Sequence, residues 1–330
     1  MGEFDLLERI RERLPPAGPR TLLGSGDDAA ISVPGGVTVT SVDALLDGVH
    51  FRRQWSDPAR IGAKALAVAL SDLAAMGAEA GEAYVVLGIP TDLDEDGCLA
   101  LLDGMGRVAE ETGTTLAGGD VTRAPALTLA VTVVGHAERP EDLVTRAGGG
   151  PGDALVVTGE LGGAAAGLRL LEQSEAPDIG HARGGSSSDA LIARQLEPKP
   201  RLAEGRMLAK AGAGAMIDLS DGLGGDARHI AEASGVGLRI EAAALPLAAG
   251  LAEAAESLGR DPLELAVRGG EDYELLAAIP PERIGEAASE IEKHGGTVLT
   301  RVGEIVAGEG LEIRLPDGAL LEATGFDQLS

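Results

Sequence analysis

Residues 146–153, RAGGGPGD, divide the chain into two halves of similar design. Glycine and proline in such density interrupt helices and strands, so this stretch predicts a boundary between domains. With 330 residues, the chain also exceeds the size at which a single hydrophobic core usually stops growing. We therefore expect a first domain over residues 1–140 and a second over residues 141–330.

Apolar runs and helical periodicities alternate on both sides of this boundary. Before it, residues 37–42 and 83–89 have the composition of strands, and residues 61–76 have the apolar spacing of a helix. After it, residues 154–158 predict a strand and residues 161–172 a helix. This alternation predicts two domains of the α/β or α+β class.

The composition limits the possible functions. A net charge of −26 with 44% apolar residues predicts globular domains with an acidic surface, which disfavours nucleic acid and anionic membranes as partners. No apolar run reaches the roughly 18 residues of a membrane span. The N-terminal sequence MGEFDLLERIRERL has no apolar signal-peptide core. A cytoplasmic location is therefore expected.

The motifs of several enzyme classes are missing. The only cysteine, Cys98, excludes an internal disulfide framework and a cysteine-based zinc site. The sequence contains no GxxxxGK(S/T) loop, no GxGxxG after a strand and no protein-kinase signatures. The five histidines show no HExxH spacing. A P-loop enzyme, a dinucleotide-binding fold and a zinc hydrolase are therefore unsupported.

Five segments place a carboxylate beside glycine or serine at the edge of an apolar element. They are GDDAA (26–30), SVD (41–43), SDLAAMG (71–77), GGDVTR (118–123) and DLSDGL (218–223). Any one of them reads most simply as a turn or a helix cap. Asp72 is harder to explain in this way, because it interrupts an apolar helix face where an unpaired carboxylate is costly. Such turns fit Mg²⁺, which binds carboxylates, waters and substrate phosphates.

Residues 92–97, DLDEDG, raise the alternative of a calcium site, because they match the start of a calcium loop. The twelfth position of that loop is Asp103 rather than the bidentate glutamate. The same residues also predict a helix start with an acidic first turn. We favour the helix start.

Together, these motifs resemble the thiamine-monophosphate kinase family, in order and over nearly the whole chain. The similar segments are GDDAA (26–30), SDLAAMGA (71–78), GGDVTR (118–123), IDLSDGL (217–223) and GGEDYELL (269–276). The wider superfamily includes aminoimidazole ribonucleotide synthetase, a hydrogenase maturation protein and selenophosphate synthetase. The last of these usually carries a reactive cysteine or selenocysteine near the N-terminus, where Cys98 does not lie.

The resemblance implies the aminoimidazole ribonucleotide synthetase-like architecture, of the α/β (α+β) class. Its N-terminal mixed sheet would pair with that of a second copy to form a barrel across a homodimer. Its C-terminal α/β sandwich domain would close a cleft that holds ATP and several Mg²⁺ ions. The implied reaction is ATP-dependent phosphorylation of thiamine monophosphate to thiamine diphosphate.

Matching motif positions carry the family's site residues onto this chain. The implied Mg²⁺ ligands are Asp28, Ser41, Val42, Asp43, Asp72, Asp120, Asp218 and Asp221. The implied ATP contacts are Gly119, Asp120, Arg146 and Ser220, and the implied substrate contacts are His50, Glu271 and Phe326. The family often has threonine where this chain has Val42, which offers only a backbone oxygen. The tail GFDQL (325–329) keeps the aromatic residue of the family's pattern but not its last two residues.

The chemistry of this reaction accounts for the residue types. Both reactants are anions, and two unit charges about 4 Å apart repel by roughly 4 kcal/mol at an effective dielectric constant of about 20. An acidic protein overcomes this only by gathering cations. The attacking phosphate has a second pKa of about 6, so direct in-line transfer needs no general base. The thiamine cation favours carboxylates and aromatic faces, for which Phe51 and Trp55 beside His50 are candidates, although core packing explains them equally well.

Two alternatives remain open on the sequence. The first is another ATP-dependent enzyme of the superfamily, such as an aminoimidazole ribonucleotide synthetase. The GGEDYELL segment (269–276) and the aromatic residues argue against it. The second is a non-catalytic acidic protein that binds metal ions and no nucleotide.

Overall fold

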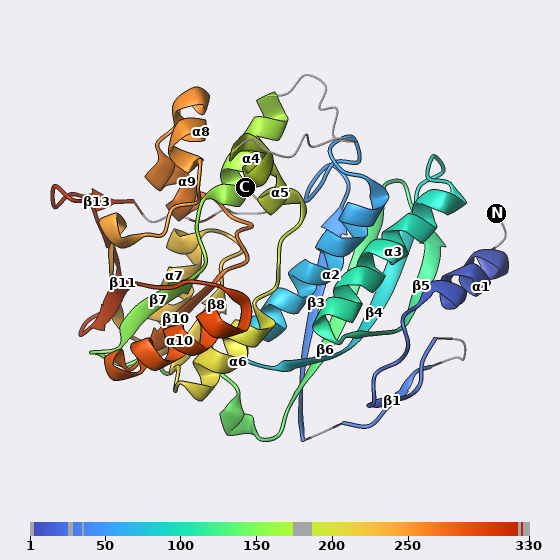
Figure 1. Cartoon of the computed structure of the whole chain (residues 1–330), viewed down its shortest axis with the longest axis horizontal. Coiled ribbons are helices and arrows are strands. Elements are labelled where there is room, and N and C mark those ends of the chain that lie inside the picture. The colour runs from blue at the N-terminus through green and yellow to red at the C-terminus, as the bar shows by residue number, and fades with distance from the viewer. Residues whose placement is uncertain (1–2, 26–28, 35, 174–186, 323–324, 326–330) are drawn as a thin grey trace. The chain divides into compact units, whose positions relative to one another are not determined.

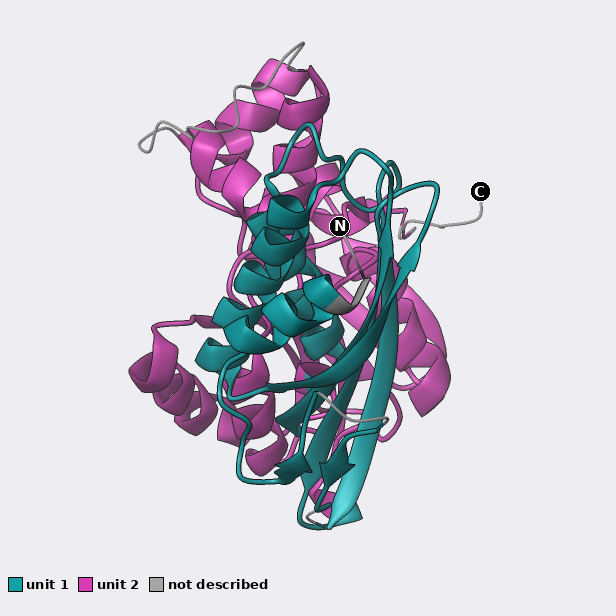
Figure 2. Cartoon of the chain, turned by 90° about the vertical axis from the view of Figure 1, so that its right-hand side faces the viewer, with its two compact units in different colours: residues 1–73, 78–140, 177–182 teal, residues 74–77, 141–176, 183–330 magenta. Residues whose placement is uncertain are grey.

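The computed structural model describes residues 3–25, 29–34, 36–173, 187–322 and 325. Within this part, the chain forms two compact units, coloured teal and magenta in Figure 2. Unit 1 takes in the chain up to Leu73 together with Ala78–Pro140. Unit 2 takes in Ala74–Gly77 and the described chain from Glu141 onward.

Unit 1 is built on a four-stranded mixed sheet (Figure 1). Its strand order is β3 (Val37–Leu46), β6 (Thr128–Ala137), β4 (Glu79–Ile89) and β5 (Thr115–Arg123). The β3–β6 and β6–β4 pairs are antiparallel, whereas β4 and β5 run parallel. A parallel pair needs a long crossover, which α3 (Glu95–Thr112) supplies. The mixed sheet expected in the first half of the chain is confirmed.

Helices cover one face of this sheet (Figure 2). The principal one is α2 (Pro58–Ala75), whose apolar residues Leu66, Leu70 and Leu73 are fully buried. The shorter α1 (Glu3–Arg13) packs on α3, and β1 (Thr21–Leu23) pairs with β2 (Ile31–Ser32) as a separate small ribbon. Burial alternates along β3, as expected for a strand with one covered and one open face.

The structure of residues 92–97 distinguishes a helix start from a calcium loop. Asp94 is the N-cap of this helix, and its carboxylate accepts a hydrogen bond from the Gly97 N–H at 2.9 Å. Glu95 and Asp96 follow in the first turn, where negative charge suits the helix dipole. Gly113 ends the helix in the left-handed conformation, with φ of 73°. The helix-start interpretation of this acidic segment is confirmed.

Unit 2 is built on a seven-stranded sheet. In order across the sheet, its strands are β13 (Leu320–Leu321), β12 (Gly310–Arg314), β9 (Gly237–Glu241), β11 (Leu299–Val306), β7 (Ala154–Thr158), β10 (Leu275–Ile279) and β8 (Ala215–Asp218). Only the β12–β9 pair is parallel. Every residue of β7 and β10 is buried, which makes these two strands the centre of the core.

Seven α-helices of unit 2 lie around this sheet in the described part of the chain (Figure 1). They are α4 (Gly163–Gln173), α5 (Ser187–Leu196), α6 (Leu202–Lys210), α7 (Leu223–Ser234), α8 (Leu251–Leu258), α9 (Pro262–Arg268) and α10 (Ile284–Gly295). Helix α7 packs against β8, β9 and β12, whereas α6 packs against β10 and α10 against β11. Across the described residues of both units, no helix is long and apolar enough to cross a membrane.

Candidate active site

The acidic cluster of unit 1 joins β3 to α2, and its residues lie within these elements, not in turns at their edges as the sequence had suggested. Ser41 and Asp43 are two residues apart on β3, so their side chains point to the same face of the sheet. Helix α2 places Asp72 beside them, and the Ser41 hydroxyl donates a hydrogen bond to the Asp72 carboxylate. The structure therefore brings together three predicted Mg²⁺ ligands from segments about thirty residues apart in the sequence.

Without a cation, the Asp43 and Asp72 carboxylates of this cluster repel each other and are costly to bury. Burial, followed by the charge of Asp72, raises the pKa of Asp43 to about 6. No group of three or more His, Cys, Asp or Glu side chains in the described ranges is arranged to hold a metal ion. Mg²⁺ nevertheless needs only one or two carboxylates, because waters and substrate phosphates complete its shell. Two carboxylates and a hydroxyl, all hard oxygen ligands, therefore fit this ion.

Two other predicted ligands of unit 1 lie apart from the cluster. The Val42 side chain is 63% exposed on the opposite face of β3, so only its backbone oxygen could bind a metal. Asp120 is exposed on β5, at the other edge of the sheet, about 14 Å from β3 at the usual strand spacing. Both roles remain predictions.

His50 follows β3 in a short turn. Its Nδ1 accepts a hydrogen bond from the Leu46 N–H at 3.2 Å, and its carbonyl accepts one from the Lys64 ammonium at 3.4 Å. Phe51 and Trp55, the aromatic candidates beside it, are each only 6% exposed. Core packing therefore accounts for both rings, and the role of His50 remains a prediction.

The acidic turn of unit 2 connects β8 to α7. Asp218 ends β8 and is only 5% exposed, and Gly222 starts the helix with φ of 101°, a conformation that strains other residues. The Asp221 N–H donates a hydrogen bond to the carboxylate of Asp226 at 3.1 Å. The turn between Asp218 and Gly222 is thus fixed by a side chain from the first turn of α7.

Asp226 was not predicted from the sequence, although its carboxylate interacts with the charges of the predicted site residues of this turn. Burial, followed by the charges of Asp218 and Asp221, raises the pKa of Asp226 to about 8, while the charge of Arg146 opposes the rise. These four residues therefore lie within electrostatic reach of one another. The signal in the sequence is an aspartate in the first turn of the helix that follows SDG (220–222).

The GGEDYELL segment lies directly against this turn. Three backbone hydrogen bonds join them, from Leu219 N–H to Glu274 O, from Tyr273 N–H to Leu219 O and from Glu271 N–H to Ser220 O, at 2.8, 2.9 and 2.8 Å. Predicted contacts for the metal, for ATP and for the substrate are therefore held in one pair of loops of unit 2.

Two glycines of the motifs permit close backbone approach. A Cβ atom on Gly119 would lie 2.0 Å from the Val85 carbonyl oxygen, and one on Gly270 would lie 2.3 Å from that of Ser220. Both distances are far shorter than any real contact, so a larger residue would push the strands or the loops apart. For Gly119, this requirement of the sheet explains the residue without reference to ATP.

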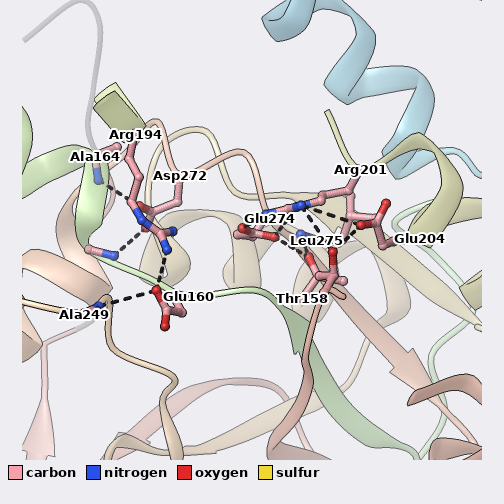
Figure 3. Close-up of polar contacts among 12 residues, drawn as sticks. Thr158, Glu160, Ala164, Arg194, Arg201, Glu204, Ala249, Asp272, Glu274 and Leu275 are labelled. Atoms are coloured by element: carbon pink, nitrogen blue, oxygen red, sulfur yellow. Dashed lines mark hydrogen bonds and ion pairs between the residues drawn. The ribbon is translucent and has the colours of Figure 1, made fainter. Parts of the chain in front are cut away.

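A buried network of charged side chains supports the GGEDYELL loop, residues 269–276 (Figure 3). Glu274, only 2% exposed, accepts hydrogen bonds from the Arg201 Nε and from the Thr158 hydroxyl, both at 2.7 Å. Arg201 Nη2 binds the second oxygen of the same carboxylate, and Glu204 lies 3.6 Å from Arg201 Nη1. Nothing in the local sequence of the motif predicts these partners.

Two predicted site residues lie outside the described part of the chain. Asp28 belongs to the GDDAA segment, and Phe326 belongs to the C-terminal tail. Their proposed roles in binding metal and substrate remain predictions.

Comparisons with known proteins settle the family. Residues 26–137 match the model of the AIR synthase related protein N-terminal domain, and residues 150–316 match that of the C-terminal domain. A thiamine-monophosphate kinase of Mycobacterium tuberculosis (strain CDC 1551 / Oshkosh) is 41% identical over 280 residues, covering 84% of this chain and 80% of that protein. This chain belongs to the thiamine-monophosphate kinase family.

Solved structures of this family agree with that assignment. The crystal structure of thiamine-monophosphate kinase from Stenotrophomonas maltophilia K279a has a TM-score of 0.84, with 38% identity and 98% of both chains covered. AaThiL complexed with AMPPCP and TMP has a TM-score of 0.76, with 31% identity, covering 98% of this chain and 96% of that chain. The two-domain architecture expected from the resemblance to thiamine-monophosphate kinases is confirmed.

Proposed function

We propose that this chain transfers the γ-phosphate of ATP to thiamine monophosphate and releases ADP and thiamine diphosphate. The observation that carries the proposal is the similarity, over nearly the whole chain, to AaThiL, a structure complexed with AMPPCP and TMP. AMPPCP is a non-hydrolysable stand-in for ATP. The acidic cluster of unit 1 and the acidic turn of unit 2 fit the same reaction, because they offer oxygen ligands for the cations that two phosphate reactants need.

The proposed Mg²⁺ ligands come from both units. In unit 1, Asp43, Asp72 and the Ser41 hydroxyl would hold Mg²⁺, and in unit 2, Asp218 and Asp221 would do so. Bound Mg²⁺ neutralises phosphate charge and stabilises the charge that develops during transfer. The raised pKa of Asp43 supports this role, because a carboxylate crowded by a second one gains most from a nearby cation.

The protein itself supplies binding and alignment rather than acid–base chemistry. The attacking oxygen of thiamine monophosphate is largely ionised at neutral pH, because the second pKa of a phosphate monoester is about 6. No side chain has to remove a proton, and we propose direct in-line transfer without a phosphoenzyme. Holding two phosphates in line removes much of the entropic part of the barrier.

The loop pair of unit 2 is proposed to place ATP and substrate relative to each other. Ser220 and Arg146 would contact the nucleotide, and Glu271 would accept hydrogen bonds from the thiamine pyrimidine or face its cationic thiazolium. The backbone hydrogen bond between Glu271 and Ser220 supports this pairing, because it fixes a nucleotide contact beside a substrate contact. The proposed contacts of His50, Gly119, Asp120, Asp28 and Phe326 complete the site.

We also propose a homodimer joined through the open face of the sheet of unit 1. Val42, Leu46 and Val86 are 63%, 36% and 44% exposed on these strands and offer apolar side chains for such a contact. Sedimentation of the intact chain and of Val86→Glu tests this, with a dimer expected for the first and a monomer for the second. Because the enzyme consumes ATP, we expect it to work in the cytoplasm.

The function is tested by incubating the chain with Mg²⁺, ATP and thiamine monophosphate and identifying all products by chromatography. Thiamine diphosphate and ADP are expected in a 1:1 ratio. Release of inorganic phosphate together with a different modified substrate would indicate an ATP-driven synthetase instead. Binding of Mg²⁺ without binding of ATP, measured by thermal shift, would indicate a non-catalytic metal-binding protein.

A further inference from the structure

The backbone around Asp272 is strained. Glu271 and Tyr273, its two neighbours, have φ of 68° and 50°, and they are the only non-glycine residues of the described chain with positive φ. Left-handed backbone costs roughly 1–3 kcal/mol for each such residue, so other contacts must hold it. Strain of this kind concentrates at functional sites, and here it includes the glutamate proposed to bind the substrate.

Asp272 supplies one of the contacts that hold this conformation. Its carboxylate accepts hydrogen bonds from the N–H groups of Gly162, at 2.8 Å, and Ala164, at 3.3 Å (Figure 3). These groups belong to the start of α4, where the helix dipole also favours a negative charge. Burial raises the pKa of Asp272 to about 7, while these two hydrogen bonds and the charge of Arg194, whose guanidinium lies beside this helix end, oppose that rise. The residue between the two strained positions is therefore anchored to a helix.

Gln195 supplies a second contact, made directly to the glutamate. It is carried by α5, is only 5% exposed, and its side-chain amide donates a hydrogen bond to Oε2 of Glu271. The two residues are 76 positions apart in the sequence. A glutamate side chain has three rotatable bonds, so a hydrogen bond to one carboxylate oxygen restricts the direction in which the other oxygen points.

We propose that Gln195 and Asp272 are positioning residues that fix the Glu271 carboxylate in the direction required to bind thiamine monophosphate. This inference rests on the proposed function, in which Glu271 contacts the substrate. Asp272 holds the backbone of the loop against α4, and Gln195 holds the carboxylate from α5. Two helices thus fix the backbone and the side chain of one binding residue.

Rigid placement matters because a binding carboxylate that moves by about 1 Å loses much of its interaction with the substrate. Neither positioning residue is expected to touch the substrate or ATP. Their loss should therefore weaken binding of thiamine monophosphate and leave binding of ATP nearly unchanged. A purely structural role would affect both substrates and the stability of the protein together.

The test compares steady-state kinetics of the full chain with those of Gln195→Met, Asp272→Asn, Glu271→Gln and the double variant Gln195→Met/Glu271→Gln. Methionine keeps the length of the glutamine side chain without its hydrogen bonds. Asp94→Asn is the matched control, because Asp94 also caps a helix through its carboxylate but lies in unit 1, on α3. Thermal unfolding of every variant shows whether it is folded.

For Gln195→Met and Asp272→Asn, we expect KM for thiamine monophosphate to rise about tenfold, the effect of losing a hydrogen bond to a charged group. KM for ATP should stay within about twofold. The double variant should be no worse than Glu271→Gln alone, because both changes disrupt the same contact. Asp94→Asn should change neither KM and should cost little stability, because asparagine caps a helix about as well as aspartate does.

Four results would overturn the inference. If the effects of the two substitutions on KM for thiamine monophosphate add in the double variant, Gln195 does not act through Glu271. Equal rises in both KM values would show a general structural role. An unchanged KM for thiamine monophosphate in Gln195→Met would show that Gln195 does not position Glu271. An unchanged KM in Glu271→Gln would remove the substrate role of Glu271 itself, whereas failure of the unmodified chain to phosphorylate thiamine monophosphate would refute the proposed function separately.

Discussion

Replacing Arg201 with methionine should destabilise unit 2 strongly, because it leaves a buried carboxylate without its cation. Glu274 is 2% exposed and accepts a bidentate pair of hydrogen bonds from this guanidinium. Removing one partner of such a pair costs about 3–5 kcal/mol, since the remaining charge stays desolvated. Burial already raises the pKa of Glu274, and the arginine is the main influence opposing that rise. Loss of the arginine should therefore also favour uptake of a proton.

The expected loss of unfolding free energy corresponds to a shift in Tm that is readily measured. For a unit of this size, Tm falls by roughly 2–4 °C per kcal/mol, so Arg201→Met should unfold about 6–20 °C below the unmodified chain. The double variant Arg201→Met/Glu274→Gln should recover more than half of the loss, because no buried charge then remains. Urea unfolding followed by circular dichroism gives the free energies directly.

A surface pair provides the control. Arg283 and Glu286 form an ion pair with side chains 44% and 66% exposed, so Arg283→Met should change stability by less than about 1 kcal/mol. The reasoning is refuted if Arg201→Met loses no more stability than Arg283→Met, or if Glu274→Gln adds to the loss instead of relieving it.

Three further predictions concern the acidic residues and the loop pair of the proposed site. Asp72→Asn should lower kcat at least about a hundredfold while the protein stays folded, since a proposed Mg²⁺ ligand is lost; near-normal turnover at saturating Mg²⁺ would contradict this. In EDTA, Tm should fall as pH rises from about 4 to about 8. The reason is that the pKa values of Asp43 and Asp226 are raised in the folded protein to about 6 and about 8, so the folded state binds protons that the unfolded state has released. Mg²⁺ should flatten this decline, and a rise of Tm across the same range in EDTA would show that the carboxylates are not crowded. Gly270→Ala should lose most activity, because its Cβ would lie 2.3 Å from the Ser220 carbonyl oxygen; unchanged kinetics would show that the loop pair tolerates separation.

Motifs with a fixed order were the most informative part of the sequence. They predicted the family, the class of fold and the kinase activity, and the comparisons confirmed the family and the architecture. The helix over residues 161–172 and the strand over residues 154–158 appear as α4 and β7 with shifts of at most two residues. Strong apolar periodicity and clear glycine stops explain this success.

Shorter and more distant features could not be predicted. Strand β8 has only four residues, too few for a period-two pattern to stand out. The Gln195–Glu271 and Arg201–Glu274 contacts join positions 76 and 73 residues apart, and a single sequence contains no signal for such pairing. The sequence does not single out Asp226, because the helix dipole sufficiently explains an aspartate in the first turn of a helix.

An isotope measurement tests most directly whether phosphate is transferred straight from one anion to the other with the help of magnesium held by the carboxylates of the proposed site. ATP labelled with ³²P in the γ-phosphate is mixed with excess thiamine monophosphate and the full chain, with either Mg²⁺ or EDTA. We predict that all transferred label appears in thiamine diphosphate, only when Mg²⁺ is present, and that none remains on the protein. Label in inorganic phosphate or on the protein, or equal transfer in EDTA, would contradict the account.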